Sequence, residues 1–242
     1  VGDLADLEMI YSFKSFFEKC VGSINFECRE ERIYINPQER MNYIFNSTIS
    51  GIEESDFILL IGTNPRFEAT ILNARIRKAY VKNKTKIYSI GNPGDLTYPY
   101  KNIGSSTSVI KEIVSGSHEL YRKIKKSKKP IIIIGESALH GKSGQYIFET
   151  LKVFLLNNNF IRKDWNALNI LTQQASRVGA LDLGVYSINE KENFDFFEKL
   201  ENNDFKFIYL LGADNINFNK SDKFVVYQGS HGDKGAEIAD II

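Results

Sequence analysis

The sequence predicts an α/β protein built on parallel sheets. Its 242 residues contain short apolar runs, most of which end in glycine and a polar residue. The runs are continuous rather than alternating, which is typical of strands buried on both faces of a parallel sheet. Helical patterns lie between them, so the strands require crossover connections, which are almost always right-handed. The predicted strands are 56–62, 85–91, 130–135, 167–171, 205–212 and 223–229.

Two of the intervening stretches space their apolar residues as helices do. In residues 3–17 the spaced residues are Leu4, Leu7, Ile10, Tyr11 and Phe17. In residues 68–80 they are Ala69, Leu72, Ile76, Ala79 and Tyr80. We expect each helix to bury the face that carries these side chains.

A lysine-rich stretch that ends at Pro130 separates two groups of predicted strands. A chain of this length is comfortable for two domains of about 120 residues each. The sequence therefore predicts a boundary near 118–129, with one α/β unit over 1–118 and a second over 119–242. We interpret the basic residues as a solvated helix end and linker rather than a polyanion site. They are Arg122, Lys123, Lys125, Lys126, Lys128 and Lys129.

Composition excludes several function classes. The net charge of +1 gives no global field for nucleic acid or an acidic membrane surface. No run of 18 apolar residues and no signal-peptide pattern is present. The spacing of Cys20 and Cys28 matches no zinc or iron–sulfur motif, so we expect free thiols and no bound metal. The missing initiator methionine and the apolar ending IADII suggest a piece of a longer protein.

The stretch PIIIIGESALHGKSG partly matches a phosphate-binding P-loop. Gly141, Lys142 and Ser143 fit the end of that motif, but Glu136 stands where its first glycine belongs. A carboxylate at that position would repel a phosphate, so the match is interpreted as chance. Asp214 is a loose candidate for the magnesium-binding acid that such a loop needs.

The histidines give weak signals. His118 lies at the predicted linker, and His140 follows Ser137 without the G-x-S-x-G turn of a nucleophilic serine. His231 lies near Asp233 on a glycine-rich loop. A metal or acid–base role for His231 stays open, but a loop residue held by local hydrogen bonds is favoured.

The stretch LLIGTNPRFE has the sequence of a strand, a tight loop and a helix start. Asn64 suits a helix N-cap, Pro65 the first helical position, and Gly62 a turn that needs positive φ. A phosphate could bind at this helix N-terminus, with Thr63 in the loop and Arg66 close by. However, the G-x-G-x-x-G fingerprint is absent. Plain strand–helix packing is therefore favoured over phosphate binding, and Asp56, Gly62 and Pro65 are expected to matter for folding.

Longer motifs occur in order along nearly the whole chain. They include GIEESDFILLIGTNPRFEATILNARIRK at 51–78, IGNPGDLTYPYKNIG at 90–104, WNALNILTQQASRVGALDLG at 165–184 and YQGSHGDKGAEIAD at 227–240. Together they resemble the large iron–sulfur (75 kDa-type) subunit of NADH:quinone oxidoreductase, in its molybdopterin-oxidoreductase-like portion. That resemblance implies two Rossmann-like α/β units.

In relatives that keep the cofactor, the loop matching Gly62–Arg66 holds a phosphate of a pterin–guanine dinucleotide, and an Asp-Pro-Arg-like turn binds guanine. Here Asn92 replaces the acid and Gly94 the arginine. An amide has one acceptor oxygen and cannot take the acid's paired hydrogen bonds to guanine. We therefore expect a vestigial loop (Gly62, Thr63, Asn64, Pro65, Arg66) and no cofactor in this chain.

The resemblance also implies a non-catalytic scaffold within a complex that passes electrons from NADH to quinone. The iron–sulfur clusters would lie in the subunit's N-terminal part. Other subunits of the peripheral arm of complex I would be partners, with no nucleic acid and no direct membrane insertion. The location would be the cytoplasmic face of a bacterial inner membrane or the mitochondrial matrix side. The LTYPY loop, with Tyr98 and Tyr100, and IADII are expected contact surfaces. The other interpretation of these two stretches is that both fold back onto their own domain. The alternative is an independent nucleotide- or molybdopterin-binding enzyme.

Overall fold

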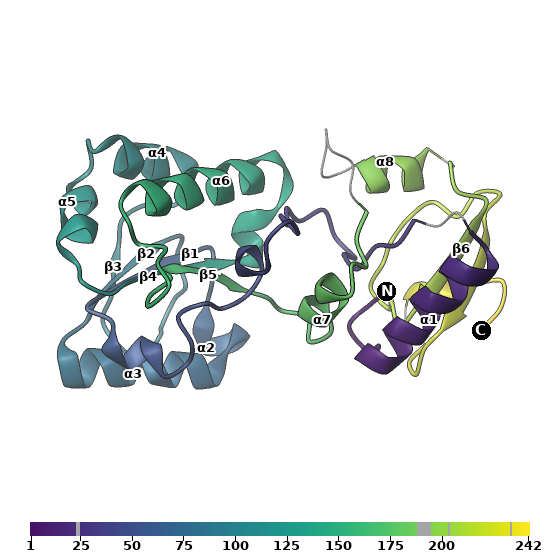
Figure 1. Ribbon diagram of the computed structural model, residues 1–242, viewed down its shortest axis with the longest axis horizontal. Helices are drawn as coiled ribbons and strands as arrows, with labels where there is room; N and C mark the ends of the chain where they lie inside the picture. Colours follow the sequence, from purple (N-terminus) through teal and green to yellow (C-terminus); the bar gives the residue numbers. More distant parts are fainter. Residues whose placement is uncertain (23–24, 188–194, 203, 233) are drawn as a thin grey trace. The chain divides into compact units, whose positions relative to one another are not determined.

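The computed structural model describes residues 1–22, 25–187, 195–202, 204–232 and 234–242 (Figure 1). It contains two units, each of which is described by itself. Unit 1 comprises Val1–Ile33 and Gln174–Ile242, and unit 2 comprises Tyr34–Gln173. The predicted boundary near 118–129 is therefore not where the structure divides. The strands on either side of the lysine-rich stretch pair with each other, so that stretch lies within unit 2.

Unit 2 is built on a five-stranded parallel sheet in the order β3-β2-β1-β4-β5. The strands are β1 Phe57–Ile61, β2 Lys86–Ile90, β3 Lys101–Asn102, β4 Pro130–Gly135 and β5 Leu168–Leu171. In register, Phe57 of β1 lies opposite Lys86 on one side and Pro130 on the other. The predicted parallel α/β class and all four strands predicted in this range are confirmed. Strand β3 was not predicted, because two polar residues carry no apolar signal.

Helices cover both faces of this sheet. Figure 1 shows α2 and α3 on one face, and α4 and α6 on the other. The elements are α2 Pro65–Glu68, α3 Thr70–Asn83, α4 Thr107–Ser115, α5 Glu119–Lys126 and α6 Gly141–Asn157, with short 3-10 turns η1 Arg40–Asn42, η2 Gly51–Glu54 and η3 Glu136–Leu139. Helix α3 buries Leu72, Ile76 and Ala79, as its predicted face requires. The central strands are fully buried, which explains their continuous apolar runs.

The predicted linker is a surface helix. His118 caps α5 by accepting a hydrogen bond from the Leu120 N–H at 3.2 Å. Leu120 and Ile124, one turn apart, are buried. The i, i+4 pair fixes the helix on the protein, and most of the basic side chains lie on its outer side.

Asp56 joins the segments that lead into β1 and β4. Its carboxylate accepts hydrogen bonds from the Ser127 hydroxyl, the Lys128 N–H at 2.9 Å and the Lys129 N–H at 3.1 Å. Burial opposes ionisation of this carboxyl, but the three hydrogen bonds together outweigh it and hold its pKa below the usual value. The predicted folding role of Asp56 thus has a specific geometry.

Asp56→Asn is expected to lower the free energy of unfolding by about 1 kcal/mol near pH 7. The three donors bind two carboxylate oxygens in the wild type, whereas the amide of the variant has one acceptor oxygen. A lowered pKa in the folded state stabilises the protein above the unfolded pKa of about 3.9, and that contribution is lost as pH falls through the folded value. In urea unfolding, the difference in the free energy of unfolding between wild type and variant should therefore be present at pH 7 and become smaller below about pH 4. A difference in the free energy of unfolding that stays constant with pH would contradict this account.

Unit 1 contains a two-stranded parallel sheet of β6 Phe207–Leu211 and β7 Phe224–Gln228. Its helices are α1 Leu7–Cys20, α7 Arg177–Asp182, α8 Asp195–Glu201 and α9 Lys234–Glu237. The strands predicted at 205–212 and 223–229 are confirmed. The core of this unit combines Leu200, Leu210, Ala213, Ile216, Phe218, Val225 and Tyr227.

The predicted buried face of α1 is wrong in part. Within this helix Ile10 is buried, whereas Leu7 and Tyr11 are exposed, and Leu4 lies exposed before the helix. The helix packs on β6 through Phe13 and the predicted Phe17, whose rings lie 4.8 and 5.8 Å from the Tyr209 ring. Helical spacing alone does not distinguish this packed face from the exposed Leu7 and Tyr11, because apolar residues lie on more than one side of the helix.

Candidate functional site

The order of the strands in unit 2 reverses between β1 and β4, so the sheet has a topological switch point there. In open α/β sheets, ligands bind outside the carboxyl ends of strands at such a point. The loop Gly62–Arg66 follows β1, and η3 follows β4. All five residues of the predicted vestigial loop therefore lie where the fold would place a ligand.

The chain itself fills the space between these two loops. Gly62 has φ of 53°, which confirms the predicted left-handed turn, and its N–H donates to the Ile90 carbonyl at 3.1 Å. The Ser137 hydroxyl of η3 donates to the Gly62 carbonyl at 2.5 Å. A Cβ on Gly62 would lie 2.7 Å from the Cβ of Ala138, well inside normal contact. The switch point is thus a close packing contact.

A carboxylate of the chain occupies the hydrogen-bond donors of the loop. Glu68 accepts from the Asn64 N–H at 2.9 Å through Oε1, and from the Thr63 hydroxyl through Oε2. Asn64 caps α2 by accepting from the Arg66 N–H at 3.1 Å, and Pro65 is the first residue of that helix, as predicted. A phosphate at this helix start would need these same N–H and O–H groups.

Arg66 is also paired within the chain. Its Nη1 donates to the Asp95 carboxylate at 2.6 Å and to the Asp95 carbonyl at 3.0 Å. A hydrogen bond from the Thr97 N–H and the Arg66 guanidinium together lower the pKa of Asp95. Asn92, in the position of the guanine-binding acid, accepts from the Gly94 N–H at 3.2 Å in a local turn.

The partial P-loop match does not form a phosphate loop. The Glu136 carboxylate accepts from the Gln173 N–H at 3.0 Å, which ties η3 to the end of β5. Lys142 and Ser143 lie in the first turn of α6, which begins at Gly141, and the Ser143 hydroxyl donates to the His140 carbonyl. Both Lys142 and Ser143 are exposed.

The remaining candidates lie in unit 1. The Tyr227 hydroxyl donates to the buried Asp214 carboxylate, so this acid has a partner within the chain. His231 is exposed beside Ser230, and Asp233 lies outside the described residues. Within the part of the chain that the structure describes, no three His, Cys, Asp or Glu side chains come together as a metal site. Cys20 and Cys28 are free thiols, and burial raises the pKa of Cys28 to about 12.

The expected contact surface at LTYPY is wrong in part. Leu96 and Tyr98 are buried, and the Tyr98 hydroxyl donates to Asn73 Oδ1 of α3 at 2.8 Å. The loop folds back because its apolar side chains complete the core of unit 2. At the other stretch, Ile241 and Ile242 are exposed.

The role of Glu68 was missed in the sequence, although a signal exists. A glutamate in the first turn of a helix can reach back to the N-cap backbone, as in a capping box. Here the acceptor is four residues beyond the N-cap Asn64 rather than three. That one-residue offset hides the pattern.

The chain belongs to the molybdopterin oxidoreductase family, whose model matches residues 1–242. Across its whole length it is similar to three named proteins. It is 43% identical to the NADH-ubiquinone oxidoreductase 75 kDa subunit of Reclinomonas americana, 41% to the mitochondrial 78 kDa subunit of Candida albicans, and 37% to the mitochondrial NADH dehydrogenase [ubiquinone] iron-sulfur protein 1 of Solanum tuberosum. It covers 36%, 32% and 32% of these relatives, about a third of their length. The predicted resemblance is confirmed.

One solved structure supports the fold alone. The formyltransferase/hydrolase complex of Methylorubrum extorquens contains a chain that is 14% identical, with a TM-score of 0.55 over 82% of this chain and 65% of that one. Among the described helices, none is both long and apolar enough to cross a membrane.

Proposed function

We propose that this chain is a non-catalytic scaffold portion of the large iron–sulfur subunit of NADH:quinone oxidoreductase. The parent complex would carry electrons from NADH to quinone, with its iron–sulfur clusters held by other parts of the subunit. Other subunits of the peripheral arm would be the partners, on the matrix side in mitochondria or the cytoplasmic side in bacteria. Similarity to the 75 and 78 kDa subunits along the whole of this chain supports this proposal.

We further propose that the switch-point loop binds neither a nucleotide nor a pterin cofactor. The observation that carries this proposal is the Glu68 carboxylate on the loop's N–H and O–H donors. A phosphate would have to displace that carboxylate or lie beside it, and two like charges at 4 Å repel by about 1–4 kcal/mol near a protein surface. The residues present do not fit a pterin–guanine dinucleotide, because η3 fills the adjacent space and Asn92 turns back on Gly94.

Calorimetric titration with GDP tests the loop. We expect that GDP does not bind the 242-residue chain more tightly than a Kd of about 1 mM. The same result is expected for Arg66→Ala and Lys142→Ala. Binding of GDP in the micromolar range that Arg66→Ala abolishes would overturn the vestigial assignment and favour a cofactor-binding enzyme. The scaffold role has a separate readout in the parent complex: Asn92→Ala should leave NADH:quinone turnover unchanged.

A further inference from the structure

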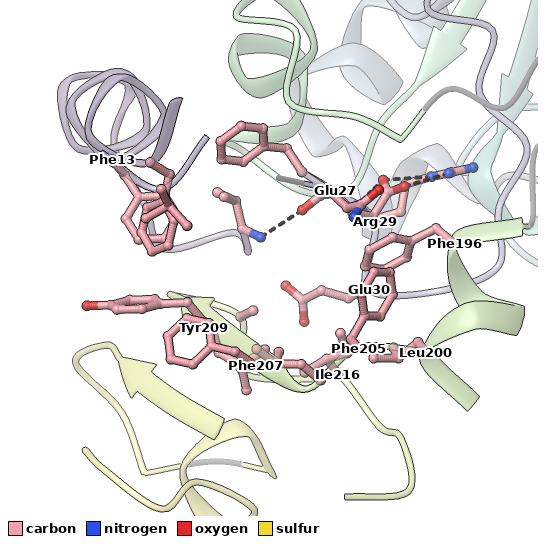
Figure 2. Close-up of a pocket in the computed structure, with 18 residues that line it drawn as sticks. Phe13, Glu27, Arg29, Glu30, Phe196, Leu200, Phe205, Phe207, Tyr209 and Ile216 are labelled. Atoms are coloured by element: carbon pink, nitrogen blue, oxygen red, sulfur yellow. Dashed lines mark hydrogen bonds and ion pairs between the residues drawn. The ribbon is translucent and has the colours of Figure 1, made fainter. Parts of the chain in front are cut away.

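Unit 1 contains a cavity of about 270 Å³ that the proposed function does not use. Its walls are β6, the segment 25–30, α1 and α8, and most of the lining side chains are apolar. Figure 2 shows Phe13 and Tyr209 on one side of this space and Phe196 and Leu200 on the other. The backbone of β6 indicates what kind of occupant fits.

One edge of β6 has hydrogen-bonding groups that the sheet does not use. The Gly212 N–H donates to the Gln228 carbonyl of β7 at 2.7 Å, so the alternate residues of β6 in step with Gly212 bond β7. Phe207, Tyr209 and Leu211 therefore direct their N–H and carbonyl groups to the opposite edge. Within the residues that the structure describes, the sheet ends at this edge. An open edge of this kind is a template for another strand.

A hydrogen bond at the end of this edge has the form of a parallel strand pair. The Gly2 N–H donates to the carbonyl of Leu211, the last residue of β6, at 2.9 Å. In two other pairs of parallel strands, a glycine directly after one strand likewise donates to the last residue of its neighbour. These bonds are Gly62 N–H to Ile90 carbonyl at 3.1 Å and Gly212 N–H to Gln228 carbonyl at 2.7 Å. By the same geometry, Val1 lies opposite Leu211.

The sequence at Val1 also has the form of a strand end. Strands β1, β2 and β6 each end in isoleucine or leucine and are followed directly by glycine. Val1 and Gly2 repeat this order, and α1 follows after a short loop, as α2 follows β1. The first residues of the chain therefore resemble the end of a strand, its connection and its helix.

The Val1 nitrogen lies where the chain would continue into the cavity. Val1 lines the cavity, and its nitrogen donates to the Glu27 carbonyl at 2.8 Å. Successive N–H groups of a strand point to opposite edges, so a strand ending here would bond β6 through Gly2 and the segment 25–30 through Val1. Burial lowers the pKa of a free ammonium at this position, because the charged form has lost water. A peptide N–H would make the same bond to Glu27 without that cost.

We propose that the segment directly before Val1 in the parent subunit fills this cavity as a strand parallel to β6, with the segment 25–30 on its other side. The inference rests on the proposed function, because the parent subunit supplies the preceding residues. The chain covers 36% and 32% of the 75 and 78 kDa relatives, so most of such a subunit lies outside it.

The position of Val1 fixes the register of this strand. The first residue before Val1 donates to the Tyr209 carbonyl and accepts from the Leu211 N–H. The third residue before Val1 donates to the Phe207 carbonyl and accepts from the Tyr209 N–H. These bonds satisfy the open edge of β6 along its length.

Both faces of this strand would be buried. The second residue before Val1 lies beside Tyr209, whose ring is 4.8 Å from Phe13. The third lies beside Ile208, which packs against the core of unit 1 together with Phe205. The residues before Val1 that match β6 are therefore expected to form a continuous apolar run. A charged residue at the second or third position would contradict the register.

Hydrogen exchange of the intact parent complex, read by mass spectrometry at single-amide resolution, tests the pairing without any substitution. The Tyr209 and Leu211 amides should exchange about 1,000-fold or more slowly than in an unstructured peptide of the same sequence. Free exchange of both amides would overturn the proposal. If the purified complex lacks the polypeptide that contains this chain, the proposed function fails instead.

A cysteine pair in the parent subunit identifies the segment that protects the edge. Tyr209→Cys combined with a cysteine at the second residue before Val1 should form a disulfide under mild oxidation, because neighbouring strands place these Cα atoms about 5 Å apart. In the matched control the second cysteine stands at the third residue before Val1, on the opposite face of the strand. Peptide mapping should find the first pair linked roughly ten-fold more than the control. Slow exchange without this preference would assign the edge to another segment or subunit and overturn the proposal.

Discussion

Arg29→Ala is expected to lower the free energy of unfolding by about 3–5 kcal/mol, the usual cost of breaking a buried ion pair from one side. Arg29 and Glu27 form a bidentate pair in which each side chain is 3% exposed. The variant leaves the Glu27 carboxylate buried, where the N–H groups of residues 28 and 29 still donate to its Oε1. It also removes the guanidinium from the Phe197 ring, 5.6 Å away, and from the Ile33 carbonyl.

Urea unfolding followed by circular dichroism measures this effect. The matched control is Lys101→Ala, because Lys101 pairs with Glu119 at 3.1 Å with side chains 63% and 52% exposed. Such a surface pair contributes about 0–1 kcal/mol, so the control should be nearly neutral. A loss below about 1 kcal/mol for Arg29→Ala would show that Glu27 finds water once its partner is gone.

The strands could be predicted because burial on both faces produces a pattern that is visible in a short stretch of sequence. Each central strand is a continuous apolar run, so β1, β2, β4 and β5 could be located from the residues alone. The pairing of β1 with β4 produces no such local pattern, since 68 residues lie between Ile61 and Pro130. The predicted domain boundary failed for that reason. A run of basic residues indicates exposure to solvent, and it is found on a surface helix such as α5 as readily as in a linker between domains.

The candidate sites likewise combine features that a short stretch of sequence predicts with contacts between segments that are distant in the sequence. The loop Gly62–Arg66 was found from local chemistry, namely an N-cap, a proline and a glycine. The closure of that loop by Ser137 depends on a strand distant in sequence. Unit 1 itself depends on an association between the first 33 residues and the last 69, which periodicity cannot reveal.

Gly62→Ala is expected to cost about 2–4 kcal/mol, more than its left-handed backbone alone explains. A side chain at φ of 53° strains the backbone by about 1 kcal/mol. The added Cβ would also lie 2.7 Å from Ala138 Cβ, and 2.9 Å from both the Ala138 nitrogen and the Ser137 Oγ. Overpacking of this kind costs about 1–3 kcal/mol, because η3 must move away from the loop.

Gly94→Ala separates the two contributions. Gly94 has φ of 71°, and a Cβ added there meets nothing within 4 Å, so this variant carries the backbone strain without the clash. It should cost about 1 kcal/mol in the same thermal or urea unfolding experiment. The difference between the two variants measures how tightly η3 packs on the loop after β1. Equal costs would mean that η3 yields easily, and the switch point could then open to a ligand. A larger cost at Gly62 is the result expected if this crevice has become part of the packed interior.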